Sequence, residues 1–382
     1  MKLRIGYIPL IDAAIPIAAA ECGFAEAQGL KLELVREVSW ANIRDKLILE
    51  LLDASHMLAP LAVATSLGVG HIKVPVVAPF GLNANGNCIT LAASLYRAIE
   101  DTLGHTPVDA RDAAQGLGRV LKKRKADGEP TPTFAVVFHF SVHAFLIRHW
   151  LRAGGISPET DVQFVVVPPP YMGASLASGQ IEGYCVGEPW NTRAVEDGTG
   201  CIAAFGSEIN RFAPDKVLVM LEKKLAEPFE ATAKLLRAYH AAAKWCENPE
   251  NRSNLADILS QPQYLNVAPR TISKALSGNL SVTRTESRNV PGFIRFGSDG
   301  INRPDPRKGR WIYAETMHLL SQPVDADNAR AAAGVFRPDL YDAAIGQSES
   351  VLEDDPIGLS FGPSFKSDDL EGYMRTLGST SS

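Results

Sequence analysis

The sequence predicts an α/β protein of two lobes. Three observations support this fold class: the length, an alternation of short apolar strands with helices, and the lack of a membrane-spanning segment. At 382 residues the chain exceeds the usual length of a single hydrophobic core, so two domains are expected. The hydrophobic fraction of 46% and the charged fraction of 21% are ordinary for a globular protein. No apolar run reaches the roughly 18 residues of a transmembrane helix, so no membrane insertion is expected.

Residues 1–88 are predicted to form the first part of lobe one. Apolar segments alternate there with helical ones, which is typical of a mostly parallel sheet with right-handed crossovers. The ligand-binding edge of such a sheet lies at the carboxyl ends of its strands. The predicted strands are 3–10, 30–38, 54–58 and 74–80, and the predicted helices are 13–27, 41–52 and 60–67.

Residues 89–213 are predicted to form lobe two, and residues 214–382 to return to lobe one. The return begins with a strand from Lys216 to Leu221 and a helix from Phe229 to Cys246. Residues 280–312 are rich in Arg, Gly and Pro, and the C-terminal end is polar, so both are expected to be surface wrap or a partly ordered tail. Lobe two should contain strands near 87–92, 133–138, 162–168 and 183–187, and helices near 94–100, 109–125 and 142–153.

Charge and cysteine usage limit the possible partners and the compartment. The net charge of −5 offers no general attraction for nucleic acid or for an anionic membrane, so an anionic ligand would have to be bound locally. The five cysteines are scattered and form no C-x-x-C pair, which indicates reduced thiols. The chain enters a strand pattern at once, without the apolar region of a secretion signal. These features predict a cytoplasmic location.

His139 and His143 are spaced as two metal ligands on one helix face would be. However, Ser141 looks like the N-cap of the helix 142–153, which leaves His139 off that face. His143 would then lie in the first helical turn, where backbone N–H groups favour an anion. A purely structural first-turn histidine is the alternative.

Four further positions have both a ligand-binding and an ordinary structural interpretation. Gly187 ends a buried strand and would let a ligand approach the backbone. Asn87 ends an Asn-rich turn where the chain leaves lobe one, and its amide can donate hydrogen bonds or serve only the turn. Trp40 could wall the cleft or simply pack, and Lys216 could face a ligand or solvent.

No sequence motif points to catalysis. The chain has no P-loop, no complete G-x-G-x-x-G, no G-x-S-x-G and no H-E-x-x-H. The basic run Lys122 to Lys125 is expected to be a solvated helix end. An enzyme acting inside the cleft stays open as an alternative if a carboxylate or thiol there has a strongly perturbed pKa, and Glu188 and Cys185 are the nearest candidates.

Taken together, these segments resemble the NrtA/CmpA family of nitrate- and bicarbonate-binding proteins. The resemblance follows the family's order through the first two-thirds of the chain. The blocks that carry it are Gly6 to Ala14, Ser39-Trp40 with Arg44-Asp45, Asn85-Gly86-Asn87, Ser141 to Ile156, Pro168 to Asn191 and Pro214 to Leu218.

The resemblance implies a two-lobed type II periplasmic-binding-protein fold with an interlobe ligand cleft. In that family a tryptophan, an amide, a histidine, a backbone glycine and a lysine hold the nitrate, and they match Trp40, Asn87, His143, Gly187 and Lys216. The amide is commonly glutamine in the family, so Asn87 is one methylene shorter. Bicarbonate-binding relatives carry an acidic residue at the lysine position to support a metal. Lys216 therefore predicts a site without metal or other cofactor, with Lys216 and His143 supplying the positive charge.

The resemblance also suggests a biological role. NasS-type sensors of this family are cytoplasmic, and they hold a NasT-like RNA-binding antiterminator until nitrate or nitrite arrives. The expected function is such a sensor, which closes on the anion and thereby releases its partner. The alternative is the substrate-binding component of an ABC transporter for nitrate or another small anion, with the transporter permease as partner. Neither function is enzymatic or involves direct contact with nucleic acid.

Overall fold

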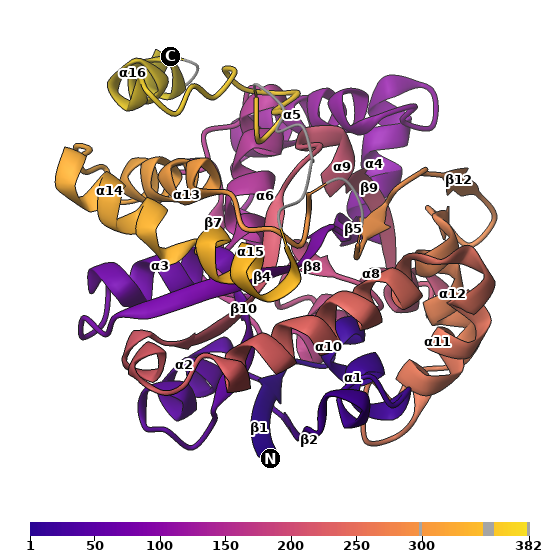
Figure 1. Ribbon diagram of the computed structural model, residues 1–382. Coiled ribbons are helices and arrows are strands. Elements are labelled where there is room, and N and C mark those ends of the chain that lie inside the picture. The colour runs from indigo at the N-terminus through magenta and orange to yellow at the C-terminus, as the bar shows by residue number, and fades with distance from the viewer. Residues whose placement is uncertain (298–299, 347–354, 380–382) are drawn as a thin grey trace.

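The described part of the chain forms two large β-sheets, which helices cover, and a separate two-stranded ribbon. The computed structural model describes residues 1–297, 300–346 and 355–379. The N-terminus lies at the bottom of Figure 1, in the lobe that contains β1 and β2, and helices α4, α5 and α6 lie at the top, in the other lobe. The predicted α/β class is confirmed.

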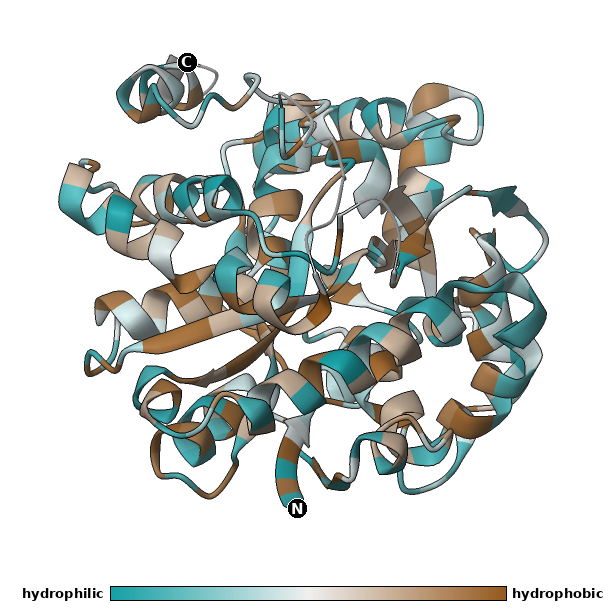
Figure 2. Ribbon diagram, viewed as in Figure 1, coloured by the Kyte–Doolittle hydropathy of each residue, from teal (hydrophilic) through white to brown (hydrophobic). Residues whose placement is uncertain are grey.

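The first sheet is built mainly from the N-terminal part of the chain. Strands β1, β2 and β3 are parallel to one another, whereas β10 is inserted antiparallel between β3 and β4. All residues of β10 are buried because it is a central strand, and β4 is hydrophobic along much of its length (Figure 2). In spatial order the strands are β13 (Ile294–Arg295), β4 (Val76–Asn85), β10 (Pro214–Leu221), β3 (Ala54–Leu58), β1 (Lys2–Tyr7) and β2 (Lys31–Arg36).

The second sheet is built from the middle of the chain. Strands β7, β6 and β8 are parallel, and β5 runs antiparallel to both β8 and β9. In spatial order these strands are β7 (Gln163–Val166), β6 (Thr133–Val136), β8 (Gly183–Gly187), β5 (Asn87–Ala92) and β9 (Gly200–Phe205). A separate two-stranded ribbon pairs β11 (Asn279–Ser281) with β12 (Ser287–Asn289).

Helices surround both sheets. Around the first sheet and in the C-terminal part they are α1 (Ala14–Glu21), α2 (Trp40–Ile48), α3 (Ala59–Leu67), α10 (Glu230–Glu247), α11 (Arg252–Ser260), α12 (Pro269–Ser277), α13 (Pro306–Leu319), α14 (Ala326–Val335), α15 (Pro338–Ile345) and α16 (Leu370–Ser379). Around the second sheet they are α4 (Ala93–Leu103), α5 (Ala110–Ala126), α6 (Val142–Ala153), α7 (Met172–Ala177), α8 (Trp190–Glu196) and α9 (Gly206–Ile209). The short 3-10 turns are η1 (Ile11–Ala13), η2 (Glu26–Gln28), η3 (Pro169–Tyr171), η4 (Glu222–Ala226) and η5 (Pro249–Asn251).

The chain first passes from one sheet to the other at Gly86. Asn85 and Gly86 have positive φ angles of 61° and 90°, and a Cβ on Gly86 would come within 2.9 Å of Ile294, so the tight passage requires glycine. The chain returns between α9 and β10. The predicted boundary after residue 88 lies inside β5, and the one after residue 213 lies at the start of β10.

The C-terminal part differs from the expected surface wrap. Helix α13 packs against α3 and α14, and Trp311 is fully buried, with its ring 5.7 Å from that of Phe145 in lobe two. Asp305 caps this helix by accepting a hydrogen bond from Arg307 N at 2.9 Å. The segments predicted to be surface wrap or tail also include residues 298–299, 347–354 and 380–382, which lie outside the described residues. None of the described helices combines the length and apolar character that a bilayer span requires.

Candidate functional site

The structure brings the five predicted residues together where the two sheets meet. Trp40 is the first residue of α2, Asn87 the first of β5, and Gly187 the last of β8. His143 lies in the first turn of α6, and Lys216 lies near the start of β10. Asn87 and Gly187 are opposite each other in the β5–β8 ladder, and the Lys216 Nζ atom is 5.5 Å from the centre of the Trp40 ring. All five residues are buried.

His143 is held in place as the sequence predicted. Ser141 is the N-cap of α6, and its hydroxyl oxygen accepts a hydrogen bond from Ala144 N at 3.1 Å. Because α6 begins there, His143 faces the site, whereas His139 lies before the helix and is exposed.

Three charged or titratable residues that the sequence did not single out complete the cluster. Asp12, in η1 directly after β1, has its Oδ2 atom 2.8 Å from Lys216 Nζ and its Oδ1 atom 2.8 Å from His56 Nε2. Asp215 lies 2.5 Å from the same lysine nitrogen through Oδ2, and its Oδ1 atom is 4.0 Å from His143 Nδ1. The ammonium group of Lys216 is therefore held between two buried carboxylates.

These ion pairs fix the charge states of Asp12 and Lys216. Burial alone would raise the pKa of Asp12, but Lys216 and His56 outweigh it and lower that pKa to about 2. Burial opposes the charged form of Lys216 as well, and the two carboxylates more than compensate, so the pKa of the lysine is raised. At neutral pH both groups are charged.

His143 does not supply the positive charge that the sequence analysis assigned to it. Burial lowers its pKa to about 4, and Asp215 opposes this only in part. The imidazole is therefore neutral near pH 7. It can still donate or accept a hydrogen bond, but the positive charge of the cluster comes from Lys216, which is already paired with two carboxylates.

Several buried polar atoms of the cluster have no hydrogen-bond partner within the described part of the chain. They include Trp40 Nε1, both polar atoms of the Asn87 side chain, both ring nitrogens of His143 and Asp215 Oδ1. Burying one such group without a hydrogen bond costs roughly 1–3 kcal/mol, so folded proteins seldom contain unpaired buried polar groups. Donors and acceptors from both lobes that converge in one buried place are suited to a small polar ligand.

Gly187 keeps this place open. A Cβ atom at this position would come within 3.2 Å of Asp12 Oδ2 and 3.4 Å of Asn87 Oδ1. Glycine is therefore the residue that lets other groups approach the backbone at the end of β8.

The two lobes are in direct contact around the cluster. Ile11 N donates a hydrogen bond to the backbone oxygen of Glu188 at 2.8 Å, and Trp190 Nε1 donates one to Pro9 O at 3.1 Å. On another side, His149 in lobe two lies 3.0 Å from the Glu315 carboxylate on α13. The cluster is therefore shut off from solvent, and a ligand has no open path to it in this structure.

The two candidates for catalysis do not have the required geometry. Burial raises the pKa of Glu188 to about 7, but its Oε2 atom accepts a hydrogen bond from Thr192 N and its Oε1 atom faces Cys88. Burial also raises the pKa of Cys185 well above its usual value, which keeps the thiol protonated and unreactive. Neither residue is placed as a base or a nucleophile.

A metal site is not favoured by the arrangement either. Among the described residues, no grouping of three His, Cys, Asp or Glu side chains is arranged to hold a metal ion. Between Asp12 and Asp215, where a divalent cation would find its carboxylates, lies the ammonium group of Lys216.

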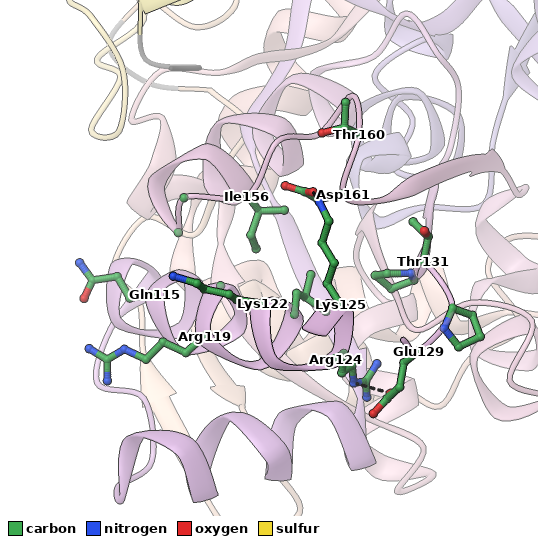
Figure 3. A pocket seen from close by; sticks show the side chains of 16 residues that line it. Gln115, Arg119, Lys122, Arg124, Lys125, Glu129, Thr131, Ile156, Thr160 and Asp161 are labelled. Carbon is green, nitrogen blue, oxygen red and sulfur yellow. Dashed lines mark hydrogen bonds and ion pairs between the residues drawn. The ribbon is translucent and has the colours of Figure 1, made fainter. Parts of the chain in front are cut away.

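A pocket of about 460 Å³ lies on the surface of lobe two, beside α5 (Figure 3). It contains none of the five predicted residues. Its lining includes Lys122, Arg124 and Lys125, of the basic run, and Lys125 is paired with Asp161 at 2.8 Å. Lys122 and Lys125 are exposed, as expected for a solvated helix end.

Comparison with known proteins gives a consistent result. The model of the NMT1-like family matches residues 1–260. The bicarbonate transport ATP-binding protein CmpC of Synechococcus elongatus is 32% identical over 384 residues, which covers 99% of this chain and 55% of CmpC. The chain thus spans about half the length of that relative. The nitrate/nitrite binding protein NrtA of Synechococcus elongatus is 30% identical, and the match covers 98% of this chain and 86% of NrtA.

A solved structure agrees over almost the whole chain. The crystal structure of the periplasmic nitrate-binding protein NrtA from Synechocystis PCC 6803 superposes with a TM-score of 0.88 at 26% identity, covering 98% of both chains. The predicted periplasmic-binding-protein fold is confirmed by this similarity.

Proposed function

We propose that this chain, a member of the NMT1-like family, is a solute-binding protein that closes its two lobes on nitrate or nitrite. It is related to the nitrate/nitrite binding protein NrtA. It acts by binding rather than by catalysis, as NrtA does. The observation that carries the proposal is the convergence of Trp40, Asn87, His143 and Gly187 around Lys216, with polar atoms of three of them buried and unpaired.

The chemistry of the unpaired atoms suits a planar oxyanion. The indole N–H of Trp40, the amide of Asn87 and the neutral imidazole of His143 can each donate one hydrogen bond to an oxygen. Nitrate has four heavy atoms, and at a ceiling of about 1.5 kcal/mol per atom it can gain roughly 6 kcal/mol, which corresponds to tens of micromolar. Hydrogen bonds to a charged ligand, worth about 1.5–3 kcal/mol each, can reach this value.

Calorimetric titration with nitrate, nitrite, bicarbonate and sulfate tests the proposal. We expect nitrate or nitrite to bind with one site per chain and a Kd of tens of micromolar or below. Bicarbonate and sulfate should bind more weakly, because Lys216 lies between the two carboxylates where a metal supporting bicarbonate would bind, and Asp12 and Asp215 oppose the second negative charge of sulfate. Binding of neither nitrate nor nitrite would refute the proposal.

Two biological roles are open for such a protein. A role as substrate-binding component of an ABC transporter is supported by the names of the relatives CmpC and NrtA. A role as a cytoplasmic sensor that releases a NasT-like antiterminator is supported by the cysteines, since all five are free and three are buried.

The sensor role requires nitrate to bind the closed form much more tightly than the open form. A change from 99% open to 99% closed needs about 5.5 kcal/mol of differential binding, nearly the whole energy available from nitrate. Because such coupling is reciprocal, excess antiterminator must weaken nitrate affinity. A pull-down of a NasT-like protein with and without nitrate tests this: partner binding that persists at saturating nitrate and nitrite would favour the transporter role.

A further inference from the structure

The charged groups of the buried cluster carry more negative than positive charge, which disfavours an anionic ligand. Asp12 and Asp215 contribute two negative charges, and the Lys216 ammonium group between them contributes one positive charge. His56 lies beside them: Ile8 N donates to its Nδ1 atom at 3.5 Å, and its Nε2 atom is 2.8 Å from Asp12 Oδ1. The two carboxylates and the ammonium group alone sum to a net charge of −1 before any anion binds, and burying a further negative charge beside them is unfavourable.

We propose that at mildly acidic pH the site takes up a proton together with the monovalent anion that it binds, and that the proton goes to the imidazole of His143. This inference rests on the proposed function. The proton brings a positive charge to the same buried place as the anion, so the pair enters without changing the net charge of the cluster.

His143 has the geometry to accept that proton. Both of its ring nitrogens are buried and unpaired within the described part of the chain, and Nδ1 points towards Asp215 Oδ1 at 4.0 Å, an oxygen that is itself without a hydrogen bond. An imidazolium would donate from one nitrogen towards Asp215 and from the other to the anion. The nitrogens of His56 already face Ile8 and Asp12, so His143 is the better placed of the two histidines.

The charged groups that act on His143 set the sign of the coupling. Asp215 on β10 and Asp12 on η1 favour the protonated form, whereas burial and Lys216 oppose it, and the pKa of the free protein is about 4. An opposite charge in contact raises the pKa of a cation by roughly 1–3, so a bound anion would raise the pKa of His143 above its value in the free protein. Between these two values, binding takes up a proton and affinity falls as pH rises.

Nitrate titration by calorimetry at pH 5.5 in two buffers of different ionisation enthalpy measures the proton uptake. For an anion that raises the pKa of His143 by about 2, in the middle of that range, we expect roughly 0.7 proton per nitrate at pH 5.5 and a Kd about fourfold weaker at pH 8 than at pH 5.5. His143→Gln retains an amide donor but cannot titrate, so its uptake should fall to near zero and its Kd should not depend on pH. Asp215→Asn should lower the uptake as well, because the charge that favours imidazolium is gone.

The exposed His105, which pairs with Asp112 on α5, provides a matched control. His105→Gln should leave the uptake unchanged. Nitrate binding by the wild-type protein with no net proton exchange and no pH dependence would overturn the inference while the proposed function stands. Full uptake in both folded variants, checked by their circular dichroism, would overturn the assignment to His143. Failure of nitrate and nitrite to bind at any pH from 5.5 to 8 would instead refute the proposed function.

Discussion

Replacement of Lys216 by methionine should destabilise the ligand-free protein strongly. Lys216 Nζ lies 2.8 Å from Asp12 and 2.5 Å from Asp215, and all three side chains are buried. Removing one member of a buried ion pair costs about 3–5 kcal/mol, because the remaining charge is left without compensation. Here two carboxylates lose the same partner, so we expect the upper part of that range.

Urea unfolding at pH 7 measures this loss, and two comparisons identify its cause. The triple variant Asp12→Asn, Lys216→Met, Asp215→Asn should recover most of the stability, because no uncompensated charge remains. Lys216→Met alone should become more stable between pH 7 and pH 5, since the pKa of Asp12 then rises above its unfolded value and the folded state binds the extra proton. The exposed pair of Lys223 with Glu50 is the control, and Lys223→Met should leave the unfolding midpoint unchanged. A loss below about 1 kcal/mol for Lys216→Met, or no recovery in the triple variant, would refute the reasoning.

Three further outcomes are expected. The contribution of His143 to the stability of the ligand-free protein should rise by about 3 kcal/mol between pH 4 and pH 6.5, because His143 has a folded pKa of about 4 and binds its proton more readily when unfolded; the raised pKa of Glu188 changes stability in the opposite direction, so denaturant unfolding of the wild type and of His143→Gln is compared at both pH values, and identical profiles would contradict this contribution. Gly187→Ala should weaken nitrate binding at least tenfold with little change in melting temperature, since the added Cβ lies 3.2 Å from Asp12 Oδ2; unchanged affinity would remove Gly187 from the site. Trp40→Phe should weaken nitrate binding about tenfold or more. It should not cost the free protein a hydrogen bond, because the indole N–H has no partner there, so the melting temperature should change little. Calorimetry and thermal melting measure the two effects, and unaltered binding would exclude the indole as a donor.

The sequence predicted the bounds of a helix or strand best where a residue typical of its end stood next to a regular pattern of apolar residues. Helix α6 has the predicted bounds, Val142–Ala153, because Ser141 provides the cap and the apolar face follows directly. Strands β3 and β8 also have the predicted bounds. In each case the local pattern and the tertiary packing favour the same structure, so local information was sufficient.

Helix α13 was missed because its stability depends on tertiary contacts. Its first residues are Pro, Arg, Lys, Gly and Arg, a composition typical of a loop, and its helical face is defined by Trp311 packing on Phe145. Asp305 followed by Pro306 was an available signal for an N-cap and first helical residue, but the surrounding Arg, Gly and Pro outweighed it.

The sequence predicted five residues that the structure gathers in one place, but it did not predict the charges around them. The resemblance to a nitrate-binding family selected Trp40, Asn87, His143, Gly187 and Lys216, and the structure gathers them. Asp12 could have been noticed as an acidic residue close behind a buried strand, at the edge where ligands bind. His56 lies within an apolar strand and had no local signal, because its partner Asp12 is distant in sequence. Such a pairing is defined only by the folded sheet.

A crystal structure of the protein grown with nitrate would test the central claim most directly. We expect the anion between the lobes, within hydrogen-bond distance of Trp40 Nε1, the Asn87 side chain and His143, with the Gly187 backbone beside it. An anion bound only elsewhere, such as in the pocket beside α5, with these polar atoms still unpaired at saturating nitrate, would contradict the account.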